Sequence, residues 1–323
     1  MNPFRLFIFC SLATVFAPNL GMAASDFEQV AGIRSLAMGG AHRALGTSND
    51  TLKLNPAGLA IQTRYAIELN YAWSEKYKES RATASAVDSK SGPVAGGLSY
   101  ELLKSDTEGK TKNLHRVSLG LGYRVGDMFA LGTTIHYTEG NRDTAGENED
   151  IREFSSDFGL LIRLSDYLQF GASWHNFVTS QETGLSPQHI GLGLSGGGQG
   201  FVVAFDTKLD ISQEELVASY HLGAEYILSR VIPIRLGYMN DERIFASGEA
   251  GRENFISGGV GYFSAGGDMD MCIALRTAIV KDEKLYIQAG GGVVYDSDAE
   301  SEFMETFHKS NAIRRAAADA AMF

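Results

Sequence analysis

Apolar and polar residues alternate with a period of two along most of the chain from Tyr65 onward. In residues 117–124, one face carries Val117, Leu119 and Leu121, while serine, glycine and arginine occupy the other. Such alternation predicts a β-strand with one apolar face. Similar runs predict twelve strands up to residue 263. Two further alternating runs, 268–280 and 285–294, bring the predicted total to about fourteen.

The connections between these runs alternate in length. A soluble β-sandwich has the same period-two strands but no reason to sort its loops, whereas a transmembrane barrel has short periplasmic turns and longer external loops. The alternation therefore favours an all-β, transmembrane antiparallel barrel. The short turns lie at 125–127, 165–166, 196–198 and 229–230, and the long polar stretches at 104–113, 139–153, 179–187, 208–215 and 240–253.

Glycine is frequent on the phase of the strands that lacks apolar residues, as at Gly120 and Gly122. Small residues on the inward face suit a lumen that holds an apolar or elongated ligand. They suit strong strand curvature equally well. Aromatic residues such as Tyr123, Phe129 and Tyr137 stand near strand ends, where barrel girdles meet the membrane interface.

The first 23 residues have the organisation of a secretory signal peptide. Arg5 precedes an apolar run over 6–16, and small residues follow up to a predicted cleavage near Ala23. The chain is therefore expected to be exported. Residues 24–64 are neither periodic nor disordered in composition, and a compact segment before the first strand can fold back into a barrel, where its backbone finds hydrogen-bond partners.

Composition narrows the function. The chain of 323 residues has a net charge of −11, which argues against nucleic acid or another phosphate-bearing partner. The external loops are expected to carry acidic clusters such as Glu147, Glu149, Asp150 and Glu153 as a solvated face. Two cysteines exclude a disulfide framework and a structural zinc site of thiolates. The seven histidines form no metal-binding spacing and are interpreted as ordinary strand and loop residues.

Two motifs precede the strands: R-S-x-x-M-G-G-A at residues 34–41 and N-P-A-G-L-A at 55–60. With the Gly/Tyr-rich strands, residues 27–264 resemble FadL-type transporters of hydrophobic compounds and the related PorV/PorQ outer-membrane proteins. The resemblance implies a fourteen-stranded barrel with an N-terminal plug. It marks five plug-motif residues: Arg34, Gly39, Gly40, Asn55 and Pro56.

The last sixty residues carry a different signature. Residues 267–277, 286–297 and 302–309 are similar to the C-terminal motifs of chorismate-binding enzymes, most closely anthranilate synthase component I. The resemblance implies that Arg276 pairs with a substrate carboxylate, that Gly290 and Gly292 approach an anion, and that Lys309 is a charged contact nearby. It also implies Mg²⁺ ligands, Glu302 and Glu305, three residues apart on one helix face.

The upstream part of that enzyme core has no counterpart in residues 27–250, so we expect no enzyme activity, and Mg²⁺ would matter only if the tail functioned. No other cofactor is expected. The chain looks like a join near residues 257–264, and natural recombination and an assembly artefact would leave the same sequence. Residues 268–294 also alternate and can supply two more strands, followed by a short C-terminal helix.

These patterns predict four parts: a signal peptide (1–23), a plug segment (24–64), an outer-membrane barrel (65–264) and a chorismate-enzyme-like fragment (265–323). The expected location is the outer membrane of a Gram-negative bacterium, with membrane lipid and hydrophobic small molecules as partners. Three functions stay open. The first is transport of hydrophobic compounds, the second is a scaffold for envelope secretion proteins, and the third is an inactive chorismate-binding remnant.

Overall fold

The structure is a computed structural model of the chain. It describes residues 8–12, 32–74, 79–107, 110–144, 147–180, 185–198, 200–212, 216–229, 231–244, 250–263, 270–274, 278–281 and 284–287. The six chorismate-like and metal-ligand residues predicted in the tail lie outside these ranges, as does the expected C-terminal helix. In the described part, no helix has the length and apolarity needed to cross a membrane.

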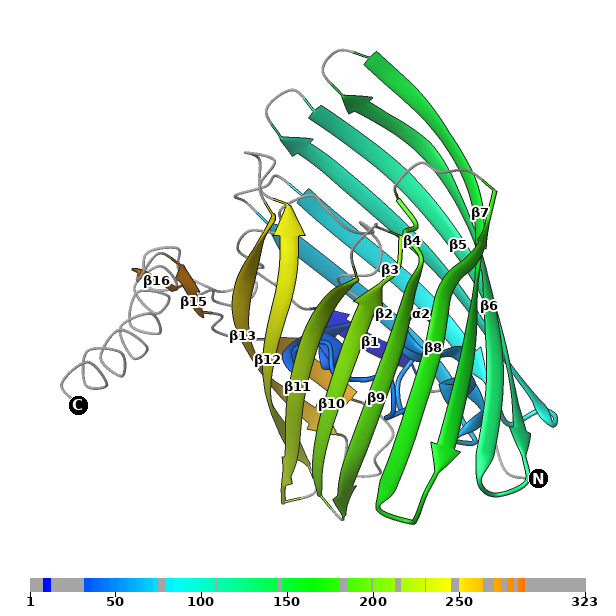
Figure 1. The fold of residues 1–323 in the computed structure, drawn as a ribbon. Helices are drawn as coiled ribbons and strands as arrows, with labels where there is room; N and C mark the ends of the chain where they lie inside the picture. The colour runs from blue at the N-terminus through cyan, green and yellow to red at the C-terminus, as the bar shows by residue number, and fades with distance from the viewer. Residues whose placement is uncertain are drawn as a thin grey trace, which may run out of the picture.

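Twelve consecutive strands form the body of the molecule, and each pairs antiparallel with the next along the chain. This matches the twelve strands predicted up to residue 263. Figure 1 shows them as one strongly curved sheet. The strands are β2 Tyr65–Ser74, β3 Glu79–Asp88, β4 Val94–Thr107, β5 Lys110–Val125, β6 Phe129–Thr144, β7 Glu147–Arg163, β8 Leu168–Thr179, β9 His189–Gly198, β10 Phe201–Asp210, β11 Val217–Leu228, β12 Ile232–Ile244 and β13 Ala250–Phe263.

The expected fourteen spanning strands are not confirmed. Strand β1 (Ile8–Leu12) pairs parallel with β2, and β14 (Asp270–Ala274) pairs antiparallel with β13. Among the described residues, no ladder joins β1 to β14, so the sheet is not closed. Two short strands, β15 (Ala278–Lys281) and β16 (Lys284–Ile287), form a hairpin (Figure 1), and β15 pairs with β13 over two residues. Strands of four or five residues are too short to cross a membrane, which takes about 9–11 residues.

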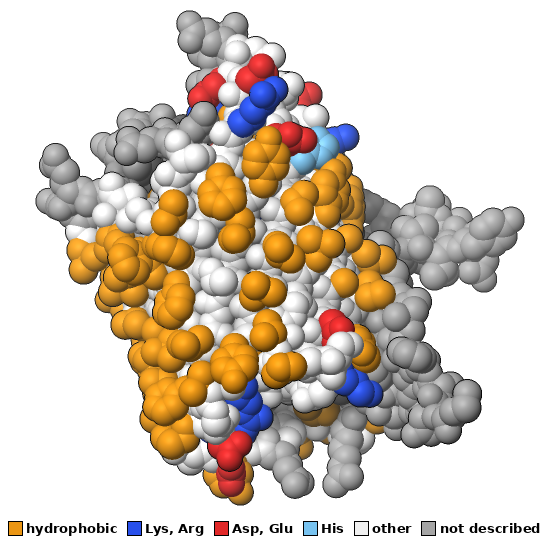
Figure 2. All heavy atoms as spheres, turned by 90° about the vertical axis from the view of Figure 1, so that its right-hand side faces the viewer, with side chains coloured by type: hydrophobic (Ala, Val, Ile, Leu, Met, Phe, Trp, Pro, Cys, Tyr) orange, Lys and Arg blue, Asp and Glu red, His pale blue; other side chains and the backbone are white. Residues whose placement is uncertain are grey.

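The apolar phase of the strands faces outward. Leu119 and Tyr123 are 51% and 50% exposed, whereas Ser118, the residue before Leu119, is 2% exposed. Figure 2 shows apolar side chains over the middle of one outer face, with charged side chains gathered toward its upper and lower ends. The predicted girdle residues Phe129 and Tyr137 also lie on the outside. This inverted arrangement, apolar outside and polar inside, suits a sheet that faces lipid.

Five short turns, the longest spanning residues 89–93, connect the strands at one end of the sheet. At the opposite end, three of the predicted long loops are wrong. Most of 104–113, 139–153 and 240–253 continues as paired strand. The strands β4 and β5 pair up to Thr107 and Lys110, β6 and β7 up to Thr144 and Glu147, and β12 and β13 up to Ile244 and Ala250. The backbone groups of these hairpins bond to each other, whether lipid or water surrounds them. The hairpins can therefore extend beyond the apolar belt.

Candidate functional site

A short segment lies inside the curve of the sheet, and we name residues 32–61 the inner segment. It contains α1 (Ile33–Ala37), α2 (Thr51–Leu54) and the 3₁₀ helix η1 (Pro56–Ala60). Figure 1 shows these blue elements enclosed by the strands. Almost all of the segment is buried, and η1 packs against β4 to β7. The predicted residues 24–64 therefore include a segment that folds back against the inner face.

The first half of the inner segment docks on β11 through Arg34. Its guanidinium donates to both Glu225 carboxylate oxygens, at 3.1 and 2.6 Å, and to Thr47 Oγ1 at 2.6 Å. Glu225 also receives a hydrogen bond from Arg235, which is fully buried. The carboxylate thus lies between two guanidinium groups, an arrangement that satisfies buried charges by pairing and hydrogen bonding.

Gly39 and Gly40 follow α1 in the left-handed backbone region, with φ of +64° and +81°. The Gly39 amide donates to Ser257 Oγ at 3.1 Å, and its carbonyl lies 2.7 Å from His221 Nδ1. A side chain at Gly39 would meet the backbone of Tyr238. Both the turn and the close approach to the wall therefore require glycine at this position.

The second half docks through Asn55 and Pro56. The Asn55 side-chain amide donates to the carbonyls of Arg43 at 2.9 Å and Leu160 at 3.1 Å, and its Oδ1 accepts from the backbone N–H of Ala57 in the first turn of η1. The bond to Arg43 joins the two halves of the inner segment, and the bond to Leu160 fixes the segment to β7. All five predicted plug-motif residues contact the wall, but they do so in two separate places.

The inward glycines of the strands now have an observed role. An added Cβ at Gly132 would overlap the Pro56 carbonyl, and one at Gly159 would overlap Asn55 Oδ1. At Gly97, the added atom would lie 2.8 Å from Leu52 Cδ2. The sequence predicted two roles for these glycines, a lumen for a ligand or strand curvature. The structure shows a different role: the glycines leave room for the inner segment.

Two more carboxylates of the wall bind the inner segment, one through an ion pair and one through backbone hydrogen bonds. Lys53 Nζ lies 2.8 Å from Glu101 Oε2, and burial lowers the pKa of Lys53 against the opposing effect of that carboxylate. Asp206 Oδ2 accepts from the backbone amides of His42 and Arg43, both at 2.8 Å. Glu101 and Asp206 are inward-facing strand residues that the sequence analysis did not select.

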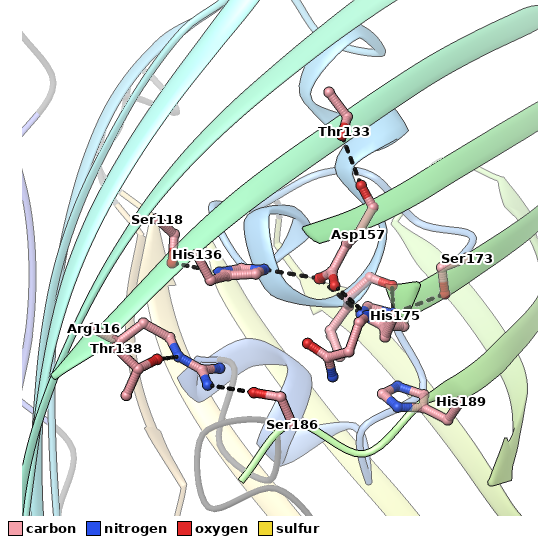
Figure 3. Close-up of polar contacts among 12 residues, drawn as sticks. Arg116, Ser118, Thr133, His136, Thr138, Asp157, Ser173, His175, Ser186 and His189 are labelled. Carbon is pink, nitrogen blue, oxygen red and sulfur yellow. Dashed lines mark hydrogen bonds and ion pairs between the residues drawn. The ribbon is translucent and has the colours of Figure 1, made fainter. Parts of the chain in front are cut away.

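A cluster of polar side chains adjoins the inner segment on β5 to β9 (Figure 3). The Asp157 carboxylate accepts from the backbone N–H of Asn176, and its Oδ2 lies 2.9 Å from both His136 Nε2 and His175 Nδ1. The carboxylate is placed by a bulge in β8, where the register shifts between Ser156 and Phe158 of β7. The His175 and His189 rings stack at 4.4 Å.

The interpretation of the histidines as ordinary residues is therefore incomplete, because His136 and His175 meet at one carboxylate and His189 stacks on His175. The assignment of Glu153 to a solvated external loop is also wrong, since it is buried on the inner face of β7. One signal in the sequence could have identified both the histidine cluster and Glu153. It is a charged residue or a histidine on the inward phase of a strand whose other inward residues are small. Within the described ranges, no group of three His, Cys, Asp or Glu residues is arranged to hold a metal ion.

Substitution of Asn55 separates its donor and acceptor roles. Asn55→Ala is expected to cost about 1–3 kcal/mol of unfolding free energy, because the cap and two carbonyl partners are lost. Asn55→Asp should cost more, since it keeps the acceptor for Ala57 but points a carboxylate oxygen at the carbonyls of Arg43 and Leu160. Urea unfolding followed by tryptophan fluorescence measures both. Equal losses in the two variants would contradict this role.

Acid is expected to weaken the docking of the inner segment through His42. Burial lowers the pKa of His42 to about 4, so the docked imidazole is neutral. A solvated histidine titrates near 6.5. The undocked state therefore binds more protons between these values, and docking is fully stable above pH 6.5 and weakens as the pH falls toward 4. Hydrogen exchange of residues 32–61 should show this loss, and His42→Gln should reduce it.

A third group of side chains lies on the inner face of β4 to β7, at a different level from the polar cluster and the ion pairs. Leu103, Leu114 and Ile151 form an apolar cluster with Leu185 on the inner side, toward the hairpin tips. Leu103 is six residues from Gly97 along β4, or about 20 Å of strand. The inner wall therefore has three levels: glycines against the inner segment, a polar level, and an apolar level.

Comparisons with solved structures find the same fold. The CymD monoaromatic hydrocarbon channel matches with a TM-score of 0.58 and 15% identity, over 78% of this chain and 94% of that one. The Ralstonia pickettii toluene transporter TbuX matches with 0.53 and 13% identity, over 83% and 95%. The Pseudomonas putida toluene transporter TodX matches with 0.55 and 14% identity, over 80% and 93%.

The tail matches other proteins. The chorismate binding enzyme family matches residues 247–315. Anthranilate synthase component 1 of Cereibacter sphaeroides is 63% identical over 75 residues, and that of Escherichia coli is 45% identical over 78 residues. These segments are 23% and 24% of this chain, and the chain spans about 15% of the length of either relative.

The resemblances to an outer-membrane β-barrel and to anthranilate synthase component I are confirmed by the family and sequence matches. The two family matches overlap over residues 247–263, which include β13 and most of the predicted join. The family described as outer membrane protein beta-barrel domain matches residues 80–263, more than half of the 323 residues. The chain therefore belongs to the outer membrane protein β-barrel domain family.

Proposed function

We propose that this protein transports hydrophobic compounds across the outer membrane and that the inner segment acts as its plug. The observation that carries the proposal is the apolar cluster of Leu103, Leu114, Ile151 and Leu185 on the inner side of the wall, toward the hairpin tips. It lies on the far side of the polar level from the inner segment. An apolar compound that enters from the hairpin tips would meet this cluster before it reaches the plug.

The fold supports the same function. The three solved structures that share it are named as a monoaromatic hydrocarbon channel and two toluene transporters. Transfer of that class to this chain is our proposal. Monoaromatic hydrocarbons are small and uncharged, so their passage requires apolar contacts and no charged partner. Because the plug lies inside the curved sheet, passage also requires that the plug is displaced. No cofactor has a role in this proposal.

Uptake by whole cells tests it. The full-length chain is expressed in a Gram-negative host, and its presence in the outer-membrane fraction is verified first. Cells should then take up radiolabelled toluene faster than cells with an empty vector. Uptake no faster than the control, from a folded outer-membrane barrel, would contradict transport. Co-purification with a large envelope complex in that case would favour the secretion-scaffold alternative.

We also propose export by the predicted signal peptide, which contains the residues of β1 (Ile8–Leu12). Cleavage near Ala23 would remove β1 from the mature protein and leave β2 as the first strand. N-terminal sequencing of the outer-membrane form should begin close to Ala24. A mature chain that begins at Met1 would refute this.

For the tail, we propose that residues 265–323 have no synthase activity. The chain spans about 15% of the length of the synthases it matches, and a substrate site made from several parts of an enzyme does not form from one part. Calorimetry with chorismate and Mg²⁺ up to millimolar concentration should give no binding heat. Measurable heat would favour the chorismate-binding alternative.

A further inference from the structure

The apolar cluster toward the hairpin tips forms one row across four strands. Leu103 of β4 pairs with Leu114 of β5. Gly140 of β6 lies opposite Leu114 on one side and opposite Ile151 of β7 on the other. Paired residues of antiparallel strands direct their side chains to the same face of the sheet. Because Gly140 has no side chain, the row has a gap between Leu114 and Ile151.

Polar and mostly charged rows border this apolar row on both sides. Residues two apart along a strand share a face and are about 7 Å apart. One such step toward the inner segment, the paired residues are Glu101, Arg116, Thr138 and Glu153. One step toward the hairpin tips, they are Ser105, Lys112, Arg142 and Glu149. On these four strands, the apolar part of the wall is therefore one row deep, which suits a compact, uncharged molecule and not an extended chain.

One leucine from another part of the chain packs on this row. Leu185 is 2% exposed and belongs to the same cluster, although it stands just ahead of β9. In the sheet, β9 is two strands away from β7 and five away from β4. Residues 185–188, which we name the strap, therefore reach across the inner side of the sheet. They bring a branched, apolar side chain to the row that lacks one at Gly140.

Hydrogen bonds outside the strand ladders hold the strap in place. Arg116 donates to Ser186 Oγ at 3.1 Å, and Figure 3 shows these two side chains pointing toward each other. The Asn176 side-chain amide donates to the Pro187 carbonyl at 3.0 Å. The ladders of β9 begin at His189, so the strap can lift from the wall without unpairing a strand.

We propose that the gap at Gly140 is a binding site for a single-ring hydrocarbon and that Leu185 is its resident occupant, which the compound displaces. The inference rests on the proposed transport of hydrophobic compounds, and it adds where the compound binds and how large it is. A phenyl-sized ring and a leucine side chain gain comparable free energy on burial, so their exchange costs little in either direction. Entry and release are then both possible, as passage through a pore requires.

The test titrates toluene into the full-length chain in lipid nanodiscs, with ¹³C-methyl-labelled leucine and isoleucine in an otherwise deuterated protein. Ring protons of toluene should give nuclear Overhauser effects to the methyl groups of Leu114 and Ile151, and the Leu185 methyl signals should shift. In Leu185→Ala, half-saturation should require about tenfold less toluene, because the competing side chain no longer has to leave its buried place. Toluene also dissolves in the lipid, but the ratio between variants in the same nanodiscs is unaffected.

Leu98→Ala is the matched control. Leu98 lies on β4, as Leu103 does, but it is 53% exposed on the outer face, so this variant should keep the wild-type half-saturation. Dodecane, which is apolar but elongated, should give no Overhauser effect to Leu114. The same effects from dodecane as from toluene would overturn the size limit set by the two polar rows.

The direction of the change in Leu185→Ala decides the role of Leu185. Weaker binding would make Leu185 a wall contact of the compound, and unchanged binding would place the compound elsewhere, so either result overturns the proposal. Should Leu185→Ala fail to fold, Ser186→Ala loosens the strap, keeps the leucine and should also lower the half-saturation. Uptake by cells is measured separately. Uptake without binding at this row overturns this inference alone, and binding here without uptake overturns the proposed transport alone.

Discussion

A Gly132→Val barrel is expected to conduct ions continuously in a planar lipid bilayer, whereas the wild-type barrel stays closed. Gly132 faces Pro56 and the start of η1, and an added Cβ would overlap the Pro56 carbonyl and the Ala57 amide. Backbone atoms cannot move aside as a flexible side-chain end can. Overpacking in a filled interior costs about 1–3 kcal/mol and sometimes more, so the inner segment should leave its place.

The control for this variant is Gly96→Val. Gly96 pairs with the outward-facing Leu121, and a Cβ at Gly96 meets no atom within 4 Å. The new side chain would project into lipid, so neither conductance nor stability should change measurably. Exchange protection of residues 55–60 provides a second readout for Gly132→Val. A closed barrel with wild-type protection there would show that the glycine is not needed for docking.

Loss of the Glu225 charge is expected to give the largest change in stability. Glu225→Gln leaves the guanidinium groups of Arg34 and Arg235 close together without their shared carboxylate. Glu225 and Arg235 are 2% and 0% exposed, so water cannot replace the pair. Removal of one partner from a buried pair costs about 3–5 kcal/mol. Urea unfolding should show this loss, and α1 should exchange its amides faster.

Glu149→Gln is the matched control. Glu149 pairs with Arg142 at 2.6 Å, but these side chains are 49% and 22% exposed near a hairpin tip. Solvent screens such a pair, so the loss should be about 0–1 kcal/mol. If the two substitutions cost the same, the charges that dock α1 would be no more important than surface charges.

Much of the fold could be predicted from the sequence because strand alternation is a local property. Val117 and Leu119 were assigned to one face and Ser118 to the other, and the structure places them so. The twelve strands up to residue 263 were predicted for the same reason. The two spanning strands predicted after that point were not confirmed. Alternation continues through the tail, but it does not indicate where a strand pairs or how long it runs.

The candidate site was predicted only in part. Asn55 and Arg34 were selected by their motif, but their partners were not. Arg34 and Glu225 are 191 residues apart in the chain, and His175 and Leu54 are 121 apart. No local pattern connects residues at such separations. The wall partners also follow no common spacing along their strands that would mark them.

The sequence by itself determined that this chain forms lipid-facing strands with a small, polar inner face, because each side chain's face follows from its neighbours along the strand. Only the tertiary structure decided which inner residues meet. Curvature of the sheet and docking of residues 32–61 bring Asp157, His175 and Leu54 together, and they assign the inward glycines to the space that this segment fills.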